Sequence, residues 1–180
     1  RMVMESQGVF VMEYYKDLTN LGINRLEPNG ASIPYGTIEN ALKRTRDASH
    51  YVKSLNGVWD FYFAECKYDI PKDHFKVDYD ASDWDTTPVP SCWQAQGYGT
   101  PHYTNSVYPI PMEPPHIPDR NETGIYRTEF TVPASFDHRR TILHFEGVNS
   151  AFTVYINGIE CGYSQCSHMP AEFEITDMLE

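Results

Sequence analysis

Hydrophobic and polar residues alternate most regularly between residues 151 and 164. Phe152, Val154 and Ile156 alternate with polar or small residues, and the run stops at Asn157-Gly158. This dipeptide supplies the two positive-φ residues of a type I′ turn, so the pattern predicts a β-hairpin with a two-residue loop. Such a loop fixes the register and should place six apolar side chains on one buried face. The expected opposite pairs are Ile156 and Ile159, Val154 and Cys161, and Phe152 and Tyr163.

The segment that follows the hairpin, residues 164–170, is small, polar and closed by a proline. This composition is typical of an exposed loop at the end of a sheet. Loops that a rigid scaffold holds in place often carry binding residues, so the segment is a candidate site.

Three further stretches show the two-residue period of strands: residues 58–64, 125–132 and 141–145. In the first, Trp59, Phe61 and Phe63 alternate with Asp60 and Tyr62. Turn signals separate these runs, and no strand-helix alternation is seen. The pattern therefore predicts an all-β fold, an antiparallel β-sandwich of the jelly-roll type.

The N-terminal part of the chain has no sustained period. Between residues 17 and 46 it is mixed and polar, prolines and glycines interrupt it, and residues 38–46 could form at most a short helix. We expect residues 1–46 to form an arm laid over the surface, with the methionine-rich opening partly foreign to the native chain. Residues 47–180 are then the jelly-roll domain.

Composition and charge narrow the classes of partner. The chain has 180 residues, of which 41% are hydrophobic, which is enough for one domain with a core. Its net charge of −11 opposes binding to a phosphate backbone or an anionic membrane. No stretch approaches the roughly 20 apolar residues of a membrane span. We therefore expect no nucleic-acid partner and no membrane partner.

Cysteine usage bears on the compartment. Cys66, Cys92, Cys161 and Cys166 form no CxxC pair and no zinc-site spacing, and no apolar leader precedes them. The pattern predicts reduced thiols and a cytoplasmic location.

Residues 97–118 form a long loop rich in proline and tyrosine, with His102 and His116. Loops of this length are usually functional or covered by a partner. Its tyrosines and Asn105 suit a sugar, because a ring packs on C–H surface while an amide binds hydroxyl groups. Equally, the tyrosines could cover one end of the sheet. Neither the histidines nor the acidic residues 80–85 have the spacing of metal ligands.

Several motifs occur in one order along nearly the whole chain, from residue 24 to residue 179. The chain resembles the N-terminal sugar-binding domain of glycoside hydrolase family two, and within that family the β-galactosidases. The motifs that carry the resemblance are Ser54-Leu55-Asn56-Gly57-Val58-Trp59-Asp60-Phe61, Val89-Pro90 with Trp93-Gln94, Gly97-Tyr98-Gly99 with Pro101, Tyr103-Thr104-Asn105 before Tyr108-Pro109, Gly124-Ile125-Tyr126-Arg127, and Gly147-Val148-Asn149-Ser150-Ala151-Phe152 through Pro170-Ala171-Glu172-Phe173.

The resemblance implies a jelly-roll domain followed by immunoglobulin-like domains and a TIM barrel that carries two catalytic glutamates. This chain ends before them, so we expect no catalytic residue here and no activity alone. The full-length enzyme would hydrolyse terminal β-galactosides with retention, and this domain would line its pocket. The implied partners are the galactoside, the remaining domains of the same chain and further copies of that chain.

By the same resemblance, Asn105 and Cys166 match positions that contact the galactosyl group. Family members carry Asp at the second position, where it also helps to hold sodium. A neutral thiol is a poor ligand for a hard cation, so Cys166 departs from that pattern. We expect no cofactor in this chain, while the full-length enzyme would use Mg or Na ions with ligands that the sequence does not identify.

Two alternatives stay open. Jelly rolls also serve as lectin domains, so the chain could be an independent carbohydrate-binding module. It could also be a structural assembly domain. Glu172 and Glu174 do not decide between these readings, because their alternation predicts strand residues and not a catalytic pair.

Overall fold

The computed structural model describes residues 2–6, 14–30, 32–103, 108, 113–118 and 120–180. The strands in this part of the chain are β1 (Met2–Ser6), β2 (Gly22–Ile23), β3 (Gly57–Ala64), β4 (Asp85–Val89), β5 (Thr123–Thr128), β6 (Ile142–Phe145), β7 (Ala151–Ile156), β8 (Ile159–Gln165) and β9 (Ala171–Glu174). The helical elements are α1 (Ile38–Leu42) and the 3₁₀ turns η1 (Tyr14–Lys16), η2 (Arg46–Ala48), η3 (Lys67–Asp69), η4 (Trp93–Gln96), η5 (Ala134–Phe136) and η6 (Thr176–Met178).

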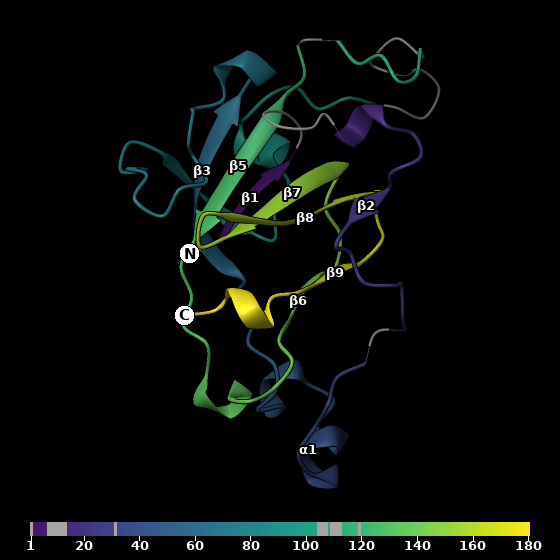
Figure 1. Ribbon diagram of the computed structural model, residues 1–180, viewed down its shortest axis with the longest axis vertical. Helices are drawn as coiled ribbons and strands as arrows, with labels where there is room; N and C mark the ends of the chain where they lie inside the picture. The colour runs from purple at the N-terminus through teal and green to yellow at the C-terminus, as the bar shows by residue number, and fades with distance from the viewer. Residues whose placement is uncertain (1, 7–13, 31, 104–107, 109–112, 119) are drawn as a thin grey trace.

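The strands form two antiparallel sheets (Figure 1). The larger sheet has the order β2-β8-β7-β1-β5-β3-β4, and the smaller sheet pairs β6 with β9. Among the described residues, helix is confined to α1 and short 3₁₀ turns. The prediction of an all-β jelly-roll sandwich is thereby confirmed.

The core fills the space between the two sheets. Phe152, Val154 and Ile156 of β7 are buried in it, as the alternation predicts, and Phe173 of β9 faces them from the smaller sheet. The ring of Phe152 meets that of Phe145 edge-on at a centroid distance of 5.0 Å. Edge-to-face ring pairs stabilise a fold slightly more than the burial of their apolar area alone does. The hairpin is thus the centre of the core.

The opening residues depart from the expectation of an arm. β1 lies inside the larger sheet, where it pairs with β5 on one side and β7 on the other. Met2, Val3 and Met4 are all buried. A strand covered on both faces is a continuous apolar run and not an alternating one, and for that reason no period marks it. The prediction of a surface arm is therefore wrong for residues 2–6. The boundary of the domain at residue 46 stays a prediction.

The hairpin register also differs from the expected one. Ile156 pairs with Ile159 as predicted, but a β-bulge shifts the ladder between Val154 and Tyr155, so that Val154 faces Gly162 and Phe152 faces Ser164. The extra residue is Cys161, which is buried in the core. Beyond a bulge the strand presents its side chains to exchanged faces. Gly162 therefore meets the ring of Phe173, while Tyr163 packs on Tyr14. Ile159 is 62% exposed and lies outside the core.

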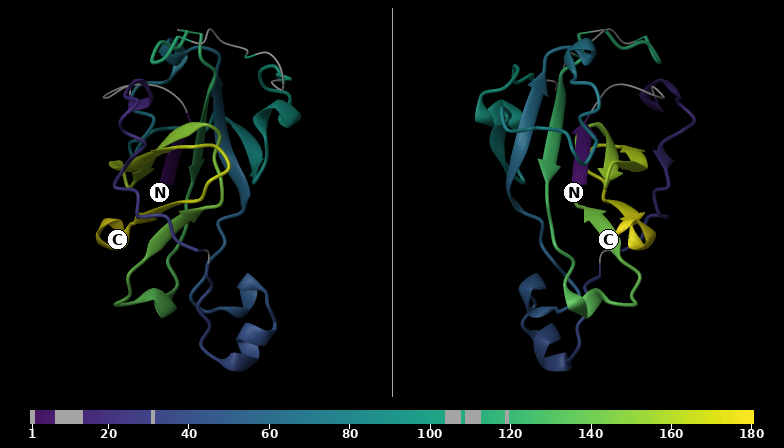
Figure 2. Two further views of the ribbon diagram at one scale, coloured as in Figure 1. Left: turned by 90° about the vertical axis from the view of Figure 1, so that its right-hand side faces the viewer. Right: turned by 60° about the vertical axis from the view of Figure 1, so that its left-hand side comes forward.

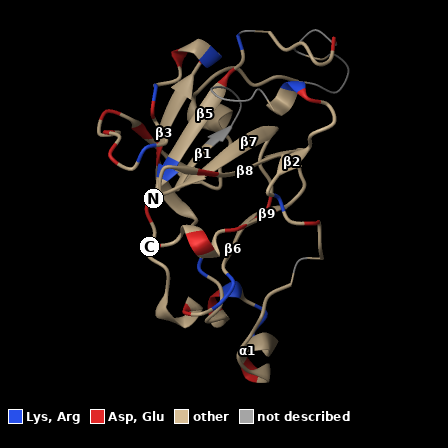
Figure 3. Ribbon diagram, in the orientation of Figure 1, with Lys and Arg blue, Asp and Glu red and all other residues tan. Residues whose placement is uncertain are grey.

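The segment with α1 extends away from the two sheets (Figure 2). Thr37 caps this helix by accepting a hydrogen bond from the backbone of Asn40. Acidic and basic residues are interspersed along the ribbon (Figure 3). Within the described residues, no helix has both the length and the apolar character to cross a membrane.

Candidate functional site

The loop between β8 and β9, residues 166–170, is the first candidate; we call it the exit loop. It lies at the right-hand side of the molecule in Figure 1. Ala151 of β7 pairs with Gln165 at the end of β8, so a buried hairpin carries the loop. Cys166, His168 and Met169 are exposed within it. The loop is thus an accessible surface on a rigid support, as the sequence predicts.

Cys166 occupies an unusual backbone conformation at the start of this loop. Its φ of 114° lies in a region that favours glycine. The Cys166 backbone N–H donates to the carbonyl oxygen of Ser150 at 3.2 Å, which ties the exit loop to the loop before β7. A non-glycine residue at such an angle costs about 1–3 kcal/mol, and such residues cluster at binding sites. This geometry agrees with a site at Cys166, although its contact with a sugar stays a prediction.

The long loop 97–118 is the second candidate, and Asn105 lies outside the described residues. The flanking tyrosines divide into two kinds. Tyr98 packs edge-on against Phe61 at 4.9 Å and donates to Asp85 Oδ2, and this hydrogen bond raises the pKa of its phenol. Tyr103 and Tyr108 are 84% and 66% exposed. Tyr98 therefore covers the sheet, whereas the side chains of Tyr103 and Tyr108 are largely exposed.

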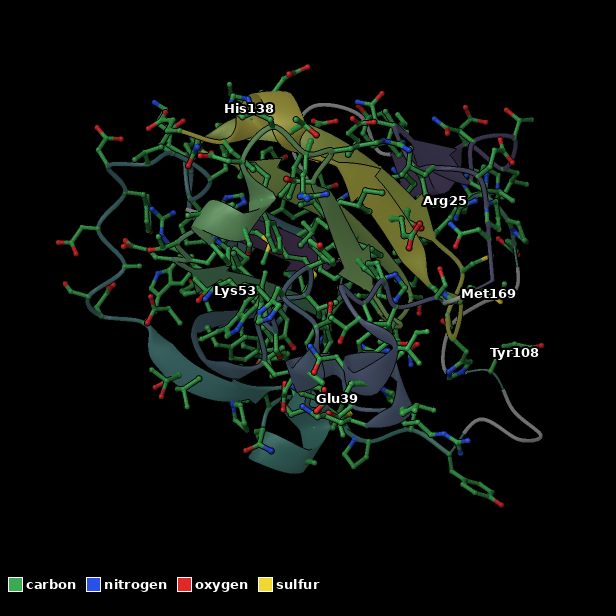
Figure 4. The ribbon with its side chains drawn as sticks, turned by 90° about the horizontal axis from the view of Figure 1, so that it is seen from below. Arg25, Glu39, Lys53, Tyr108, His138 and Met169 are labelled. Atoms are coloured by element: carbon green, nitrogen blue, oxygen red, sulfur yellow. The ribbon has the colours of Figure 1, made fainter. Side chains whose placement is uncertain are left out.

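Seen from below, Tyr108, Met169 and Arg25 lie toward the same side of the molecule (Figure 4). The sequence links the two candidate loops only through the family resemblance, because no periodicity connects residues so far apart in the chain.

The acidic groups near the exit loop are held by partners. His144 Nδ1 lies 2.8 Å from Glu172 Oε1, and Asn29 donates to the other oxygen at 2.7 Å. These bonds, the one from His144 first, hold the pKa of Glu172 below its usual value. Glu174 pairs with Arg140 at 2.8 Å. Both glutamates alternate with buried residues of β9, which confirms that they are strand residues with a structural role.

A metal ion in a protein is held by several ligand side chains that lie close together. In the described part of the chain, no three His, Cys, Asp or Glu side chains are close enough together to hold a metal. Cys166 offers a thiol where a hard cation prefers oxygen. The expectation that a longer enzyme uses sodium or magnesium ions stays a prediction.

The N-terminal arm makes contacts with β8 that the sequence pattern does not predict. Arg25 Nη1 donates to Ser164 Oγ at 3.1 Å and to the Gln165 carbonyl at 3.3 Å. Gln165 also donates to the carbonyl oxygens of Leu21 and Asn20. The one available signal was the polar pair Asn24-Arg25 between Ile23 and Leu26, which is too short for a pattern.

The described structure is a two-sheet sandwich in which both candidate loops carry exposed side chains. Residues 52–180 match the family profile described as "Glycosyl hydrolases family 2, sugar binding domain". The chain belongs to this family.

Curated relatives are similar in sequence to most of the chain. It is 38% identical over 167 residues to a protein named beta-galactosidase from Actinobacillus pleuropneumoniae, which covers 93% of this chain and 16% of the relative. A beta-galactosidase from Priestia megaterium is 42% identical over 163 residues, with 88% and 16% covered. One from Psychromonas ingrahamii is 44% identical over 133 residues, with 74% and 13% covered. The chain thus spans about a sixth of the length of such relatives.

Proposed function

We propose that this chain is the sugar-binding domain of a longer β-galactosidase, in which it lines the pocket where terminal β-galactosides are hydrolysed with retention. The observation that carries the proposal is the match of 93% of the chain to one part of a protein of that name. A retaining glycosidase needs two carboxyl groups about 5 Å apart. The other domains of the longer protein supply them, because the glutamates of β9 are engaged in structural contacts.

In this proposal Asn105 and Cys166 contact the galactosyl group. Asn105 has an amide that donates to and accepts from sugar hydroxyls, whereas a thiol is a weak donor and a weak acceptor. Cys166 therefore acts mainly by the shape of its loop. A cytoplasmic location and a homo-oligomer belong to the proposal as well; the former rests on the cysteine pattern and the latter on the family resemblance.

The decisive experiment is steady-state kinetics of the full-length protein. Losing one hydrogen bond at a desolvated site costs about 1–3 kcal/mol, so Asn105→Ala should lower kcat/KM about ten- to a hundredfold. Cys166→Ser should change it little. Wild-type kinetics for Asn105→Ala would refute its contact with the sugar.

Calorimetry on the 180-residue chain separates the other readings. One wall of a pocket lacks the converging groups of a complete sugar site, so the chain alone should bind galactose weakly or not at all. Binding in the micromolar range would favour an independent carbohydrate-binding module. A large contact between copies without any sugar effect would favour an assembly domain.

A further inference from the structure

Arg25 lies in the N-terminal arm and contacts strands of both sheets. Its backbone forms an isolated bridge with Phe173 of β9, while its guanidinium reaches across to the end of β8. A Cβ added at Gly22 would lie 3.1 Å from Arg25 Nε and 3.3 Å from Cζ, which is closer than side chains normally approach. The guanidinium is therefore packed directly against the backbone of Gly22.

The acceptors of Arg25 are the last two residues before the exit loop. One nitrogen, Nη1, supplies both bonds, to the hydroxyl of Ser164 and to the carbonyl of Gln165. Ser164 is only 3% exposed, and it faces the smaller sheet because the bulge in the hairpin has exchanged the faces of β8. Without that bulge, Ser164 would face away from Arg25. The bulge and the arginine thus act together at the point where β8 ends.

The partners of Arg25 are neutral oxygens. Among the described residues it forms no ion pair with a carboxylate, so its charge strengthens bonds to a hydroxyl and a carbonyl instead. A hydrogen bond to a charged donor is worth about twice a neutral one. The charge of Arg25 therefore stabilises the conformation of the last two residues of β8.

We propose that Arg25 is a positioning residue for the galactoside pocket, which fixes the direction in which β8 passes into the exit loop and thereby places Cys166. This inference rests on the proposed function. Arg25 does not touch the substrate; it acts through Ser164 and Gln165 on the residue that follows them.

Hydrogen exchange on the full-length protein tests the structural half of the proposal without reference to activity. The amides of Gln165 and Cys166 donate to the arm and to Ser150. In Arg25→Ala they should exchange at least about threefold faster, because the end of β8 opens locally. Arg46→Ala is the matched control, since Arg46 belongs to the same arm but pairs with Glu146. Unchanged exchange in Arg25→Ala, or an equal increase in the control, overturns the proposal.

Kinetics test the functional half. Arg25→Ala should raise KM for a galactoside about three- to tenfold with kcat changed less than about twofold, because the pocket wall is misplaced while the catalytic groups are not. Arg25→Lys should recover part of the loss, and Gly22→Ala, which presses on the guanidinium, should reproduce part of it. A global loss of folded protein would lower kcat and leave KM unchanged. An unchanged KM therefore overturns the proposal, whatever happens to kcat.

The two failures are distinguishable. If the wild-type full-length protein does not cleave galactosides, the proposed function fails. The exchange experiment then still decides whether Arg25 positions the exit loop.

Discussion

At the scale of single residues, Phe152 is a main anchor of the core. It is 3% exposed and contacts the rings of Phe145 and Phe173 from the smaller sheet. Phe152→Ala should lower the free energy of unfolding by about 3–5 kcal/mol, because it leaves a cavity between the sheets. Ile159→Ala on the same hairpin is the control and should cost little, since Ile159 is mostly exposed. Urea titration measures both, and equal costs would contradict the observed register.

Glu172 links stability to pH. The bond from His144 holds the folded-state pKa of Glu172 below its ordinary value of 4.5. Its contribution is complete above that value and is lost as the pH falls through the lowered folded-state pKa. Glu172→Gln should cost about 1–2 kcal/mol at neutral pH and should make stability depend less on pH in the acidic range.

The control for this prediction is Glu174→Gln on the same strand. The side chain of Glu174 is 43% exposed, and an exposed pair contributes less than about 1 kcal/mol. Urea titrations at several pH values compare the two variants. If the free energy of unfolding of the wild type falls no more steeply with decreasing pH than that of Glu172→Gln, the role of Glu172 is contradicted.

At the scale of elements, Gly162 sets the form of β8. A Cβ there would lie 2.5 Å from the carbonyl oxygen of Ile23 and 2.7 Å from the ring of Phe173. Gly162→Ala should therefore displace β2 or that ring and cost about 1–3 kcal/mol. Gly57→Ala is the control, because nothing lies within 4 Å of its added Cβ. Thermal unfolding of both variants checks this, and equal melting temperatures would contradict the close packing.

The same elements show which parts of the fold could be predicted from the sequence. The hairpin, β3 and the two-sheet core follow from alternation, because each has one face toward the core. β1 could not be found this way, since both of its faces are covered. The bulge brings Gly162 close to the carbonyl oxygen of Ile23, a residue far from the hairpin in sequence, so no local pattern marks it. Of the candidate site, the exposed exit loop followed from composition, whereas the arm contacts to Gln165 are long-range and leave no local pattern.

At the scale of the whole molecule, α1 presents apolar surface away from the sheets. Ile38 and Leu42 are 81% and 71% exposed, and their spacing of four places them on one helix face. The 180-residue chain alone should therefore self-associate at high concentration. Replacing both residues by Ser should reduce this. Sedimentation velocity measures it, and a monomer at every concentration, with no binding of an apolar dye, would contradict it.

The place of β1 in the sheet also affects the timing of synthesis on the ribosome. Its two neighbours are completed only at Thr128 and Ile156, so the strand must wait for roughly 150 residues to be translated. At about 5–20 residues per second this delay is about 8–30 s. Nascent chains stalled before residue 151 should accordingly be cleaved readily by protease, and those stalled well past residue 180 should resist. Until both neighbours are made, the apolar side chains of Met2, Val3 and Met4 lack the cover that buries them in the folded sheet.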